Sequence, residues 1–448
     1  MREFISCNQQ ELFADCDSAT IQNAIAAAIE DGCRKVVIPR YNLRTDKNEW
    51  RISSAIEVPS EITIILDNCF MVQETGVYDN MFRNSHAYAE NRTKETQQHD
   101  ISIIGVGNVC LSGGVHNGLL ERTSRKNGFP SIYQNQMILW INVCNLRVEN
   151  LHIENQRHWA INHIYCENVK IKNIDFYATP HVPNMDGIDL RIGCNHFEIE
   201  NITGRTGDDT IAMTAVSGIT ENASYVEGKP TDICDVKIRN VLSDPFRMLN
   251  VRLLTQDGHK VHDIDIDTIM DTSDFATKVK CLSPIGIGTQ GMLYVKVCRA
   301  KQDDTNNITA RNIYTRASLA IRIDDVCSNS TFTNIQTFNT CFTVLGTAGF
   351  GCSLKDVTLD SIWFGGMKSD SQRGYVDGYV APTVVKMPDT RGTLCIKNLH
   401  TDGIEYLCNA GDELDVRFEN CMVENVNNIS ANIGKTKITV DGEVYKGE

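Results

Sequence analysis

The stretch NLHIENQRHWAINHIYCENVKIKNIDF, residues 150–176, contains one short pattern twice: an asparagine, an aliphatic residue and then alternating residues. Asn150 and Asn173 open the two copies and lie 23 residues apart. Asparagines return at a similar spacing further along the chain, at Asn201, Asn312, Asn334, Asn398 and Asn420. A period near 22 residues, the distance from Asn312 to Asn334, with short β-like segments and no helix between them, is typical of the coils of a β-helix.

The repeat predicts an all-β chain that folds as a single-stranded parallel β-helix. Each coil is expected to bury alternate aliphatic residues and to pair with its neighbours through backbone hydrogen bonds. A leucine-rich repeat has a similar period, but its leucine-dense consensus is absent here, where Ile, Val and Asn dominate. Asparagines at equivalent turns can stack and exchange amide hydrogen bonds from coil to coil. We therefore expect asparagine ladders along the stack.

Both ends of the sequence carry segments that are typical of caps. Residues 18–31, SATIQNAIAAAIED, form the one clear amphipathic helix, with Asp17 or Ser18 as its N-cap and Gly32 at its end. This α-helix is expected to cover the first coil. Residues 437–445, KITVDGEVY, predict a closing hairpin with an Asp-Gly turn.

No Pro/Gly/Ser-rich tract or charge block divides the 448 residues. Repeat folds grow in one dimension, so the length does not require several domains. We expect one β-helix domain over residues 1–448, made of an N-terminal cap region (1–45), coils (about 46–430) and a closing segment (about 431–448). The polar stretch 80–98 is expected to be a long loop.

Composition excludes several classes of function. The net charge of −14 and the pI of about 5.3 argue against nucleic acid or an anionic membrane as partner. The 17 cysteines include no CxxC pair, so a zinc site is not expected, and no residue is assigned to a metal. Many cysteines and no visible signal peptide favour a reducing cytoplasm, or secretion if a leader has been removed. The sequence leaves the oligomeric state open.

Two segments place carboxylates beside glycine at a strand end: Asn184-Met185-Asp186-Gly187-Ile188-Asp189 and Thr206-Gly207-Asp208-Asp209-Thr210-Ile211-Ala212. Asp186 and Asp209 are 23 residues apart, which is one coil, and adjacent coils lie about 4.8 Å apart. Crowded carboxylates repel one another, so at least one pKa should rise and give a proton donor beside a proton acceptor. Glycoside hydrolysis requires that pairing. The alternative is an aspartate ladder that caps turns or binds Ca²⁺.

Residues 159–213 resemble the core of glycoside hydrolase family 28, the polygalacturonases, within the pectin-lyase-like superfamily. The similar features are a Trp followed by aliphatic residues and the N-x-D-G-I-D motif one coil before G-D-D. The resemblance implies a right-handed β-helix and an inverting hydrolase of a uronate-containing carbohydrate that needs no cofactor. In that family the first Asp of the pair is the acid, so Asp208 would protonate the leaving oxygen. Asp209 and Asp186 would hold and activate water.

The chain departs from the family downstream of these motifs. Where polygalacturonases have Gly-His-Gly, residues 243–249 read SDPFRML, and Arg247 stands in that region. For the family's Arg-Ile-Lys motif, which binds the substrate carboxylate, the candidates are Lys278 with Lys280, and Arg322. A sugar other than galacturonate is an equal alternative.

Further substrate-binding candidates surround the two motifs: Asn184, Asp189, His158, Trp159 and His181. Trp159 could stack on a sugar face, or be a core aromatic. The histidines could line the cleft, or be structural. Two other functions stay open at this point. A lyase or epimerase on the same fold would use Lys278 and Lys280, and a non-catalytic or tailspike-like β-helix would only bind carbohydrate.

Overall fold

The computed structural model describes residues 2–114, 136–179, 184–274, 281–289, 298–338, 341–349, 351–365, 381–411, 413–430 and 437–445. The chain divides into two compact units. The first comprises Met1–Gly207 and Gly218–Thr231, and the second comprises Asp208–Ser217 and Asp232–Glu448.

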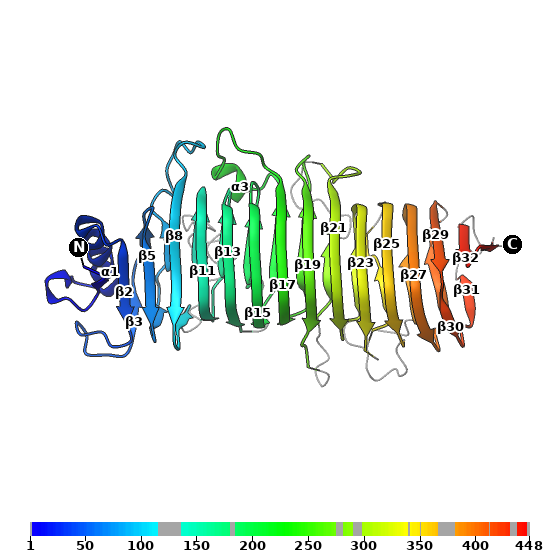
Figure 1. The fold of residues 1–448 in the computed structure, drawn as a ribbon, viewed down its shortest axis with the longest axis horizontal. Coiled ribbons are helices and arrows are strands. Elements are labelled where there is room, and N and C mark those ends of the chain that lie inside the picture. The colour runs from blue at the N-terminus through cyan, green and yellow to red at the C-terminus, as the bar shows by residue number, and fades with distance from the viewer. Residues whose placement is uncertain are drawn as a thin grey trace. The chain divides into compact units, whose positions relative to one another are not determined.

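The first unit contains two sets of parallel strands. In Figure 1 the longer strands of one set follow one another in chain order from β2 to β15. This set consists of β1 (Ile5–Ser6), β2 (Lys35–Pro39), β3 (Trp50–Ile52), β5 (Thr63–Asp67), β6 (Phe70–Gln73), β8 (Gln98–Val106), β9 (Cys110–Ser112), β11 (Val143–Glu154), β13 (Glu167–Tyr177) and β15 (Asn195–Thr206). The other set consists of β4 (Ile56–Val58), β7 (Phe82–Asn84), β10 (Ile138–Ile141), β12 (Ile161–Ile164) and β14 (Ile188–Arg191).

The second unit repeats this arrangement. Its longer set runs in chain order from β17 to β29 in Figure 1. It consists of β17 (Ile233–Pro245), β19 (Val261–Asp271), β21 (Thr305–Thr315), β23 (Val326–Thr337), β25 (Cys352–Phe364), β27 (Thr390–Asp402), β29 (Leu414–Glu419), β30 (Met422–Glu424), β32 (Lys437–Val440) and β33 (Glu443–Tyr445). The other set consists of β16 (Ile211–Ala215), β18 (Leu249–Thr255), β20 (Ser283–Ile287), β22 (Leu319–Ile323), β24 (Thr343–Gly346), β26 (Thr383–Met387), β28 (Tyr406–Ala410) and β31 (Asn428–Ser430).

The core of each unit is a stack of aliphatic side chains from successive coils. Val148 lies opposite Ile171, and Leu151 lies opposite Ile174, in the parallel pairing of β11 with β13. All four are buried, while the alternate residues of both strands are exposed or half-buried. Each such side chain contributes about 1.5–3 kcal/mol when it leaves water, so the period-2 pattern fixes the inward face of the strand.

Asparagine ladders run along the turns, as the repeat predicts. Asn173 Nδ2 donates to Asn150 Oδ1 at 2.8 Å, and Asn201 Nδ2 donates to Asn173 Oδ1 at 2.9 Å. The second unit has the equivalent bonds from Asn334 to Asn312 and from Asn420 to Asn398. The first three have φ values of 61°, 56° and 58°, in the left-handed region that asparagine tolerates better than most residues.

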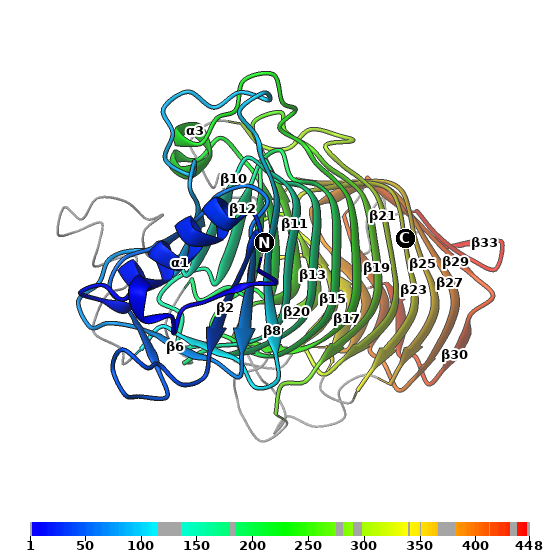
Figure 2. The same ribbon diagram turned by 60° about the vertical axis from the view of Figure 1, so that its left-hand side comes forward.

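Helix α1 (Asp17–Asp31) lies against β1, β2, β3 and β4 at the N-terminal end of the first unit (Figure 2). Gly32 ends it with φ = 81°, as expected. The predicted N-cap is wrong: Cys16 holds that position, and its Sγ accepts the Ala19 N–H at 3.4 Å. Asp17 instead pairs with Arg44, at 2.6 Å, because its carboxylate is buried. A short 3₁₀ helix, η1 (Gln10–Leu12), precedes α1.

The segment Gly218–Thr231 carries α3 (Ile219–Ala223) and packs within the first unit. Two ion pairs hold it there, one fully buried and one with a half-buried glutamate. Glu221 pairs with Arg191 at 2.5 Å, and Lys229 pairs with Glu167 of β13 at 3.1 Å. Removing charges from water is costly, so these pairs fix where the segment sits.

The predicted fold class is confirmed: the chain is all-β, with right-handed parallel β-helix coils and an N-terminal capping helix. The closing hairpin is also confirmed, because β32 and β33 pair antiparallel around Asp441 and Gly442. The predicted loop 80–98 is partly wrong, since β7 lies inside it and pairs with β4 and β10. The single domain over residues 1–448 stays a prediction.

All 17 cysteines lie in the described residues, and none forms a disulfide. Among the helices described, none has the length and apolar character needed to cross a membrane.

Candidate active site

Asp186 lies in the turn that leads into β14 and is 3% exposed. The backbone carbonyl of Asp186 accepts the Ala160 N–H at 3.0 Å, and that of Gly187 accepts the Ile161 N–H at 3.0 Å. Asn184, two residues before Asp186, has φ = 63°. The turn is therefore tied by its backbone to the preceding coil, and the stack determines where Asp186 lies.

A buried charge cluster continues along β14. Asp189 and Arg191 are 0% and 2% exposed. Arg191 Nη2 lies 2.5 Å from Glu221 Oε1 of α3, and Arg191 Nη1 lies 3.7 Å from Asp189 Oδ1. The guanidinium also stacks 4.4 Å above the centre of the Trp159 ring. Asp189 and Trp159, both predicted to bind substrate, are thus buried around Arg191.

The histidines predicted near the site are placed only in part. The His158 ring is buried 4.5 Å from the ring of Trp159. His163, five residues further along the chain, donates its Nδ1–H to the Asp189 carbonyl oxygen at 3.0 Å. That carbonyl can only accept, so Nδ1 carries the proton. Burial lowers the pKa of His163 to about 4, which keeps this imidazole neutral. His181 lies outside the described residues.

In the second unit, Asp208 and Asp209 form the turn that leads into β16. The Asp209 N–H donates to Asp208 Oδ1 at 3.0 Å, and the Asp208 side chain is half-buried. Asp209 is fully buried, and its Oδ1 accepts the Leu249 N–H at 3.0 Å. Arg252 Nε lies 3.0 Å from Asp209 Oδ2. The two neighbouring carboxylates therefore occupy different environments, one reaching toward solvent and one held by β18.

Burial raises the pKa of Asp209 to about 7, and the Asp208 carboxylate adds to this rise. Arg252, the Leu249 N–H and the charge of Arg322 oppose it. The ion pair with Arg252 at 3.0 Å would by itself favour the charged form, so loss of hydration is the larger effect. A carboxyl group whose pKa lies near neutrality can hold or release a proton at working pH.

Arginines line the face of the shorter strand set beside Asp209. Arg252, Gly286 and Arg322 lie opposite one another on β18, β20 and β22. Arg322 Nε donates to Asp324 Oδ2 at 2.6 Å. Sequence reasoning selected Arg322 but missed Arg252. The available signal was a lone charged residue inside the strand LNVRLLT.

The remaining predicted ligands are placed elsewhere or not described. Arg247 is exposed in the turn between β17 and β18, with φ = 63° and its guanidinium 5.4 Å from the Phe246 ring centre. Lys278 and Lys280 lie outside the described residues. Asp186 belongs to the first unit, and Asp208 with Asp209 to the second. The predicted meeting of these three carboxylates stays a prediction.

The comparison with known families agrees with this arrangement of motifs. The family model for glycosyl hydrolases family 28 matches residues 49–228, which contain all three aspartates. This part of the chain is similar to glycosyl hydrolases family 28. The match ends before Arg247, where the chain departs from the family's downstream motifs.

Two curated relatives from Arabidopsis thaliana are similar to this chain. A probable polygalacturonase is 28% identical over 193 residues, 41% of this chain and 39% of the relative. Polygalacturonase QRT2 is 26% identical over 273 residues, 56% of this chain and 59% of the relative. The chain thus spans between two fifths and three fifths of the length of these relatives.

Solved structures share the fold. The family 28 exopolygalacturonase of Yersinia enterocolitica matches with a TM-score of 0.53 and 13% identity, over 99% of this chain and 79% of that one. A mannuronan C-5 epimerase module of Azotobacter vinelandii matches with a TM-score of 0.51 and 13% identity, over 98% of both chains. Enzymes with different reactions share this fold, so the function must be argued from the site.

Proposed function

We propose that this protein hydrolyses a glycosidic bond in a uronate-containing oligo- or polysaccharide, with inversion at the anomeric carbon. The family 28 match and the polygalacturonase relatives support this class of reaction. The observation that carries the proposal is the aspartate pair at the start of β16, in which one carboxylate is half-buried and the other is fully buried beside Arg252. Polygalacturonate oligomers are the first substrates to test.

The two carboxylates suit different roles. Asp208 has access to solvent and is the general acid that protonates the leaving oxygen. Asp209 is fixed by Arg252 and the Leu249 N–H, and it acts as base toward the attacking water, with Asp186 as its predicted partner. An inverting mechanism needs an acid and a base on opposite faces of the sugar, with space for one water. The proposed roles require no metal and no cofactor.

Buried arginines support an anionic sugar. Arg252 and Arg322 are 8% and 5% exposed, and both charges act on Asp209. Guanidinium groups bind carboxylates through paired hydrogen bonds, which matches the carboxylate of a uronate. The proposed substrate carboxylate would bind along this row on β18 and β22.

The test is turnover of galacturonate oligomers, with the anomeric configuration of the first product followed by NMR. Asp208→Asn should lower kcat about 10²- to 10⁴-fold, because protonation of the leaving group is lost. The same variant should lose much less activity on an aryl glycoside of the same sugar, whose leaving group needs no proton. Asp232→Asn is the matched control, since Asp232 is also half-buried in the second unit and accepts one backbone N–H, from Lys260 at 3.0 Å.

Other outcomes would replace the proposal. Unsaturated products that absorb in the near ultraviolet would indicate a lyase, and a changed uronate without cleavage would indicate an epimerase. Binding without turnover would indicate a non-catalytic β-helix. Full activity of Asp208→Asn on natural oligomers would remove Asp208 as the acid. The cytoplasmic location is a separate proposal, and fractionation of the native cells tests it.

A further inference from the structure

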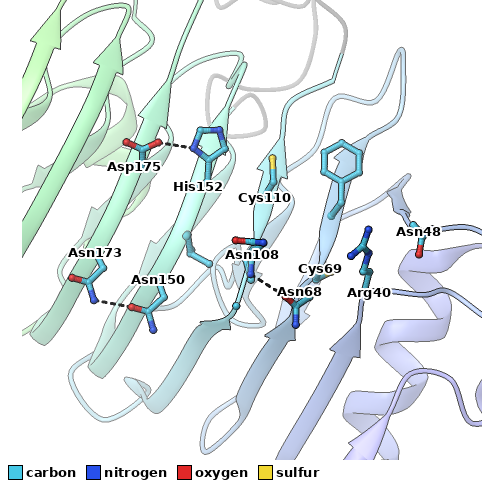
Figure 3. A pocket seen from close by; sticks show the side chains of 14 residues that line it. Arg40, Asn48, Asn68, Cys69, Asn108, Cys110, Asn150, His152, Asn173 and Asp175 are labelled. Atoms are coloured by element: carbon cyan, nitrogen blue, oxygen red, sulfur yellow. Dashed lines mark hydrogen bonds and ion pairs between the residues drawn. The ribbon is translucent and has the colours of Figure 1, made fainter.

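A second group of potential ligands lies on the longer strand set of the first unit. Cys110 of β9 stands opposite His152 of β11 in the parallel pairing of these strands. Glu154 follows His152 by two residues and therefore projects from the same face of β11. One ligand atom from each of the three side chains lies within 4.8 Å of the others. Figure 3 shows the Cys110 sulfur and the His152 ring side by side.

The next strand orients the histidine. Asp175 of β13 lies opposite His152, and its Oδ2 is 2.7 Å from His152 Nδ1 (Figure 3). Asp175 is in turn held by the Thr203 hydroxyl, which donates to Asp175 Oδ1 at 2.6 Å. A carboxylate that accepts from Nδ1–H leaves the lone pair of a neutral imidazole on Nε2. His152 Nε2 lies 3.9 Å from Glu154 Oε2, on the side of the cluster.

We propose that Cys110, His152 and Glu154 bind a zinc ion, with Asp175 as the residue that positions His152. Thiolate, imidazole and carboxylate are zinc's protein ligands, and three of them leave the fourth tetrahedral position to water. The carboxylate–histidine–metal arrangement is the usual support of such a site. Calcium and magnesium prefer sites made only of oxygen, which this cluster is not.

The three side chains need to move only slightly to coordinate a zinc ion. Bond lengths of about 2.0–2.3 Å place ligand atoms of a tetrahedral zinc site about 3.3–3.8 Å apart. The present separations, up to 4.8 Å, close by side-chain rotation. His152 and Glu154 are 36% and 29% exposed, so an ion can enter from solvent. A groove of about 650 Å³ adjoins the cluster and is lined by Cys110, His152 and Asp175. The site is independent of the proposed hydrolase chemistry.

The experiment measures zinc binding to the full-length protein, kept reduced and first stripped of metal, by equilibrium dialysis with elemental analysis. We expect the wild-type protein to bind one equivalent of zinc tightly. Cys110→Ser and His152→Gln should each weaken it at least about 10- to 100-fold, and Asp175→Asn about tenfold. Circular dichroism and the melting temperature check that each variant folds. Cys395→Ser is the matched control, because Cys395 is also half-buried on a long strand but lies opposite Thr358 and Arg417.

Cobalt(II) provides the second readout. A cobalt-loaded protein should show a thiolate-to-cobalt charge-transfer band that disappears in Cys110→Ser and persists in Asp175→Asn and Cys395→Ser. Wild-type zinc affinity in folded Cys110→Ser would overturn the proposal. The proposal would also be overturned if the wild-type protein bound no zinc, or if its cobalt-loaded form showed no thiolate band. An equal loss of zinc affinity in Cys395→Ser would overturn it as well.

Discussion

Asp209 shows how one residue combines opposing electrostatic effects. Its carboxyl group is fully buried, yet it faces Arg252 and accepts the Leu249 N–H. Burial outweighs these contacts and raises its pKa from 3.8 to about 7. The folded protein therefore holds the Asp209 proton more tightly than the unfolded chain does.

This difference predicts how stability depends on pH. Stabilisation by the Asp209 proton is fully present below pH 3.8 and is lost as the pH rises to about 7. Asp209→Asn does not titrate, and it changes the contact with Arg252 by an amount that varies little with pH. The melting temperature of the wild-type protein minus that of the variant should therefore fall between about pH 4 and pH 7 and then level off. Scanning calorimetry across this range tests it, and a constant difference would contradict the shift.

At the scale of elements, the asparagine ladder joins neighbouring coils through side chains. Asn173 both donates to Asn150 and accepts from Asn201, with φ = 56°. Asn173→Ala removes both bonds and places a Cβ-bearing residue without a side-chain amide in the left-handed region. It should destabilise the fold by about 3–4 kcal/mol, since each of the two hydrogen bonds contributes about 1 kcal/mol and the conformation costs about 1–2 kcal/mol.

Asn173→Gly separates these two causes. Glycine loses the same hydrogen bonds but adopts a positive φ without the steric cost, so it should be about 1 kcal/mol more stable than the alanine variant. Urea unfolding of the wild-type protein, Asn173→Ala and Asn173→Gly measures the differences in the free energy of unfolding. If alanine were as stable as asparagine, the ladder would contribute nothing.

The segment that carries α3 depends on one buried carboxylate. Glu221 is 1% exposed and lies 2.5 Å from Arg191. Removing one partner of a buried pair costs about 3–5 kcal/mol, because the remaining charge loses its closest counter-charge. Glu221→Ala should therefore increase hydrogen exchange in residues 218–231 and lower the free energy of unfolding. Glu227→Ala, an exposed glutamate in the same segment, should change neither. Unchanged exchange in Glu221→Ala would show that other contacts hold the segment.

At the scale of the whole molecule, a stack of parallel strands presents unpaired backbone groups at an open edge. β32 pairs with β29 through residues such as Val416 and Ile438, and β33 then folds back on β32. This hairpin covers the edge of β29. An open edge can pair with another chain, so it favours aggregation.

Truncation tests this role. Removal of residues 431–448 should expose β29 and shift the protein toward larger species in size-exclusion chromatography with light scattering. A chain that ends after Tyr445 keeps the hairpin and should behave as the full-length protein does. If the chain without residues 431–448 eluted as the untruncated protein does, the protective role of β32 would be contradicted.

The sequence by itself determined the elements. The 22- to 23-residue repeat with alternating aliphatic residues specifies the coils, because the period of a strand decides which side chains turn inward. The Asp-Gly turn specified the hairpin, and the neighbouring Asp208 and Asp209 were recognisable as an acidic pair. The α1 N-cap was missed, because Asp17 is drawn into the ion pair with Arg44, 27 residues away.

Only the tertiary structure decided which distant residues meet. Loops of unequal length separate successive strands, so residues that stack are 23 positions apart in one coil and more than 40 in another. Arg252 reaches Asp209 from 43 residues away, and Cys110 reaches His152 from 42. No short motif records such contacts, since hydrogen-bonded register between coils creates them. The same register removes water from Asp209 and shifts its pKa, which composition and spacing could not specify.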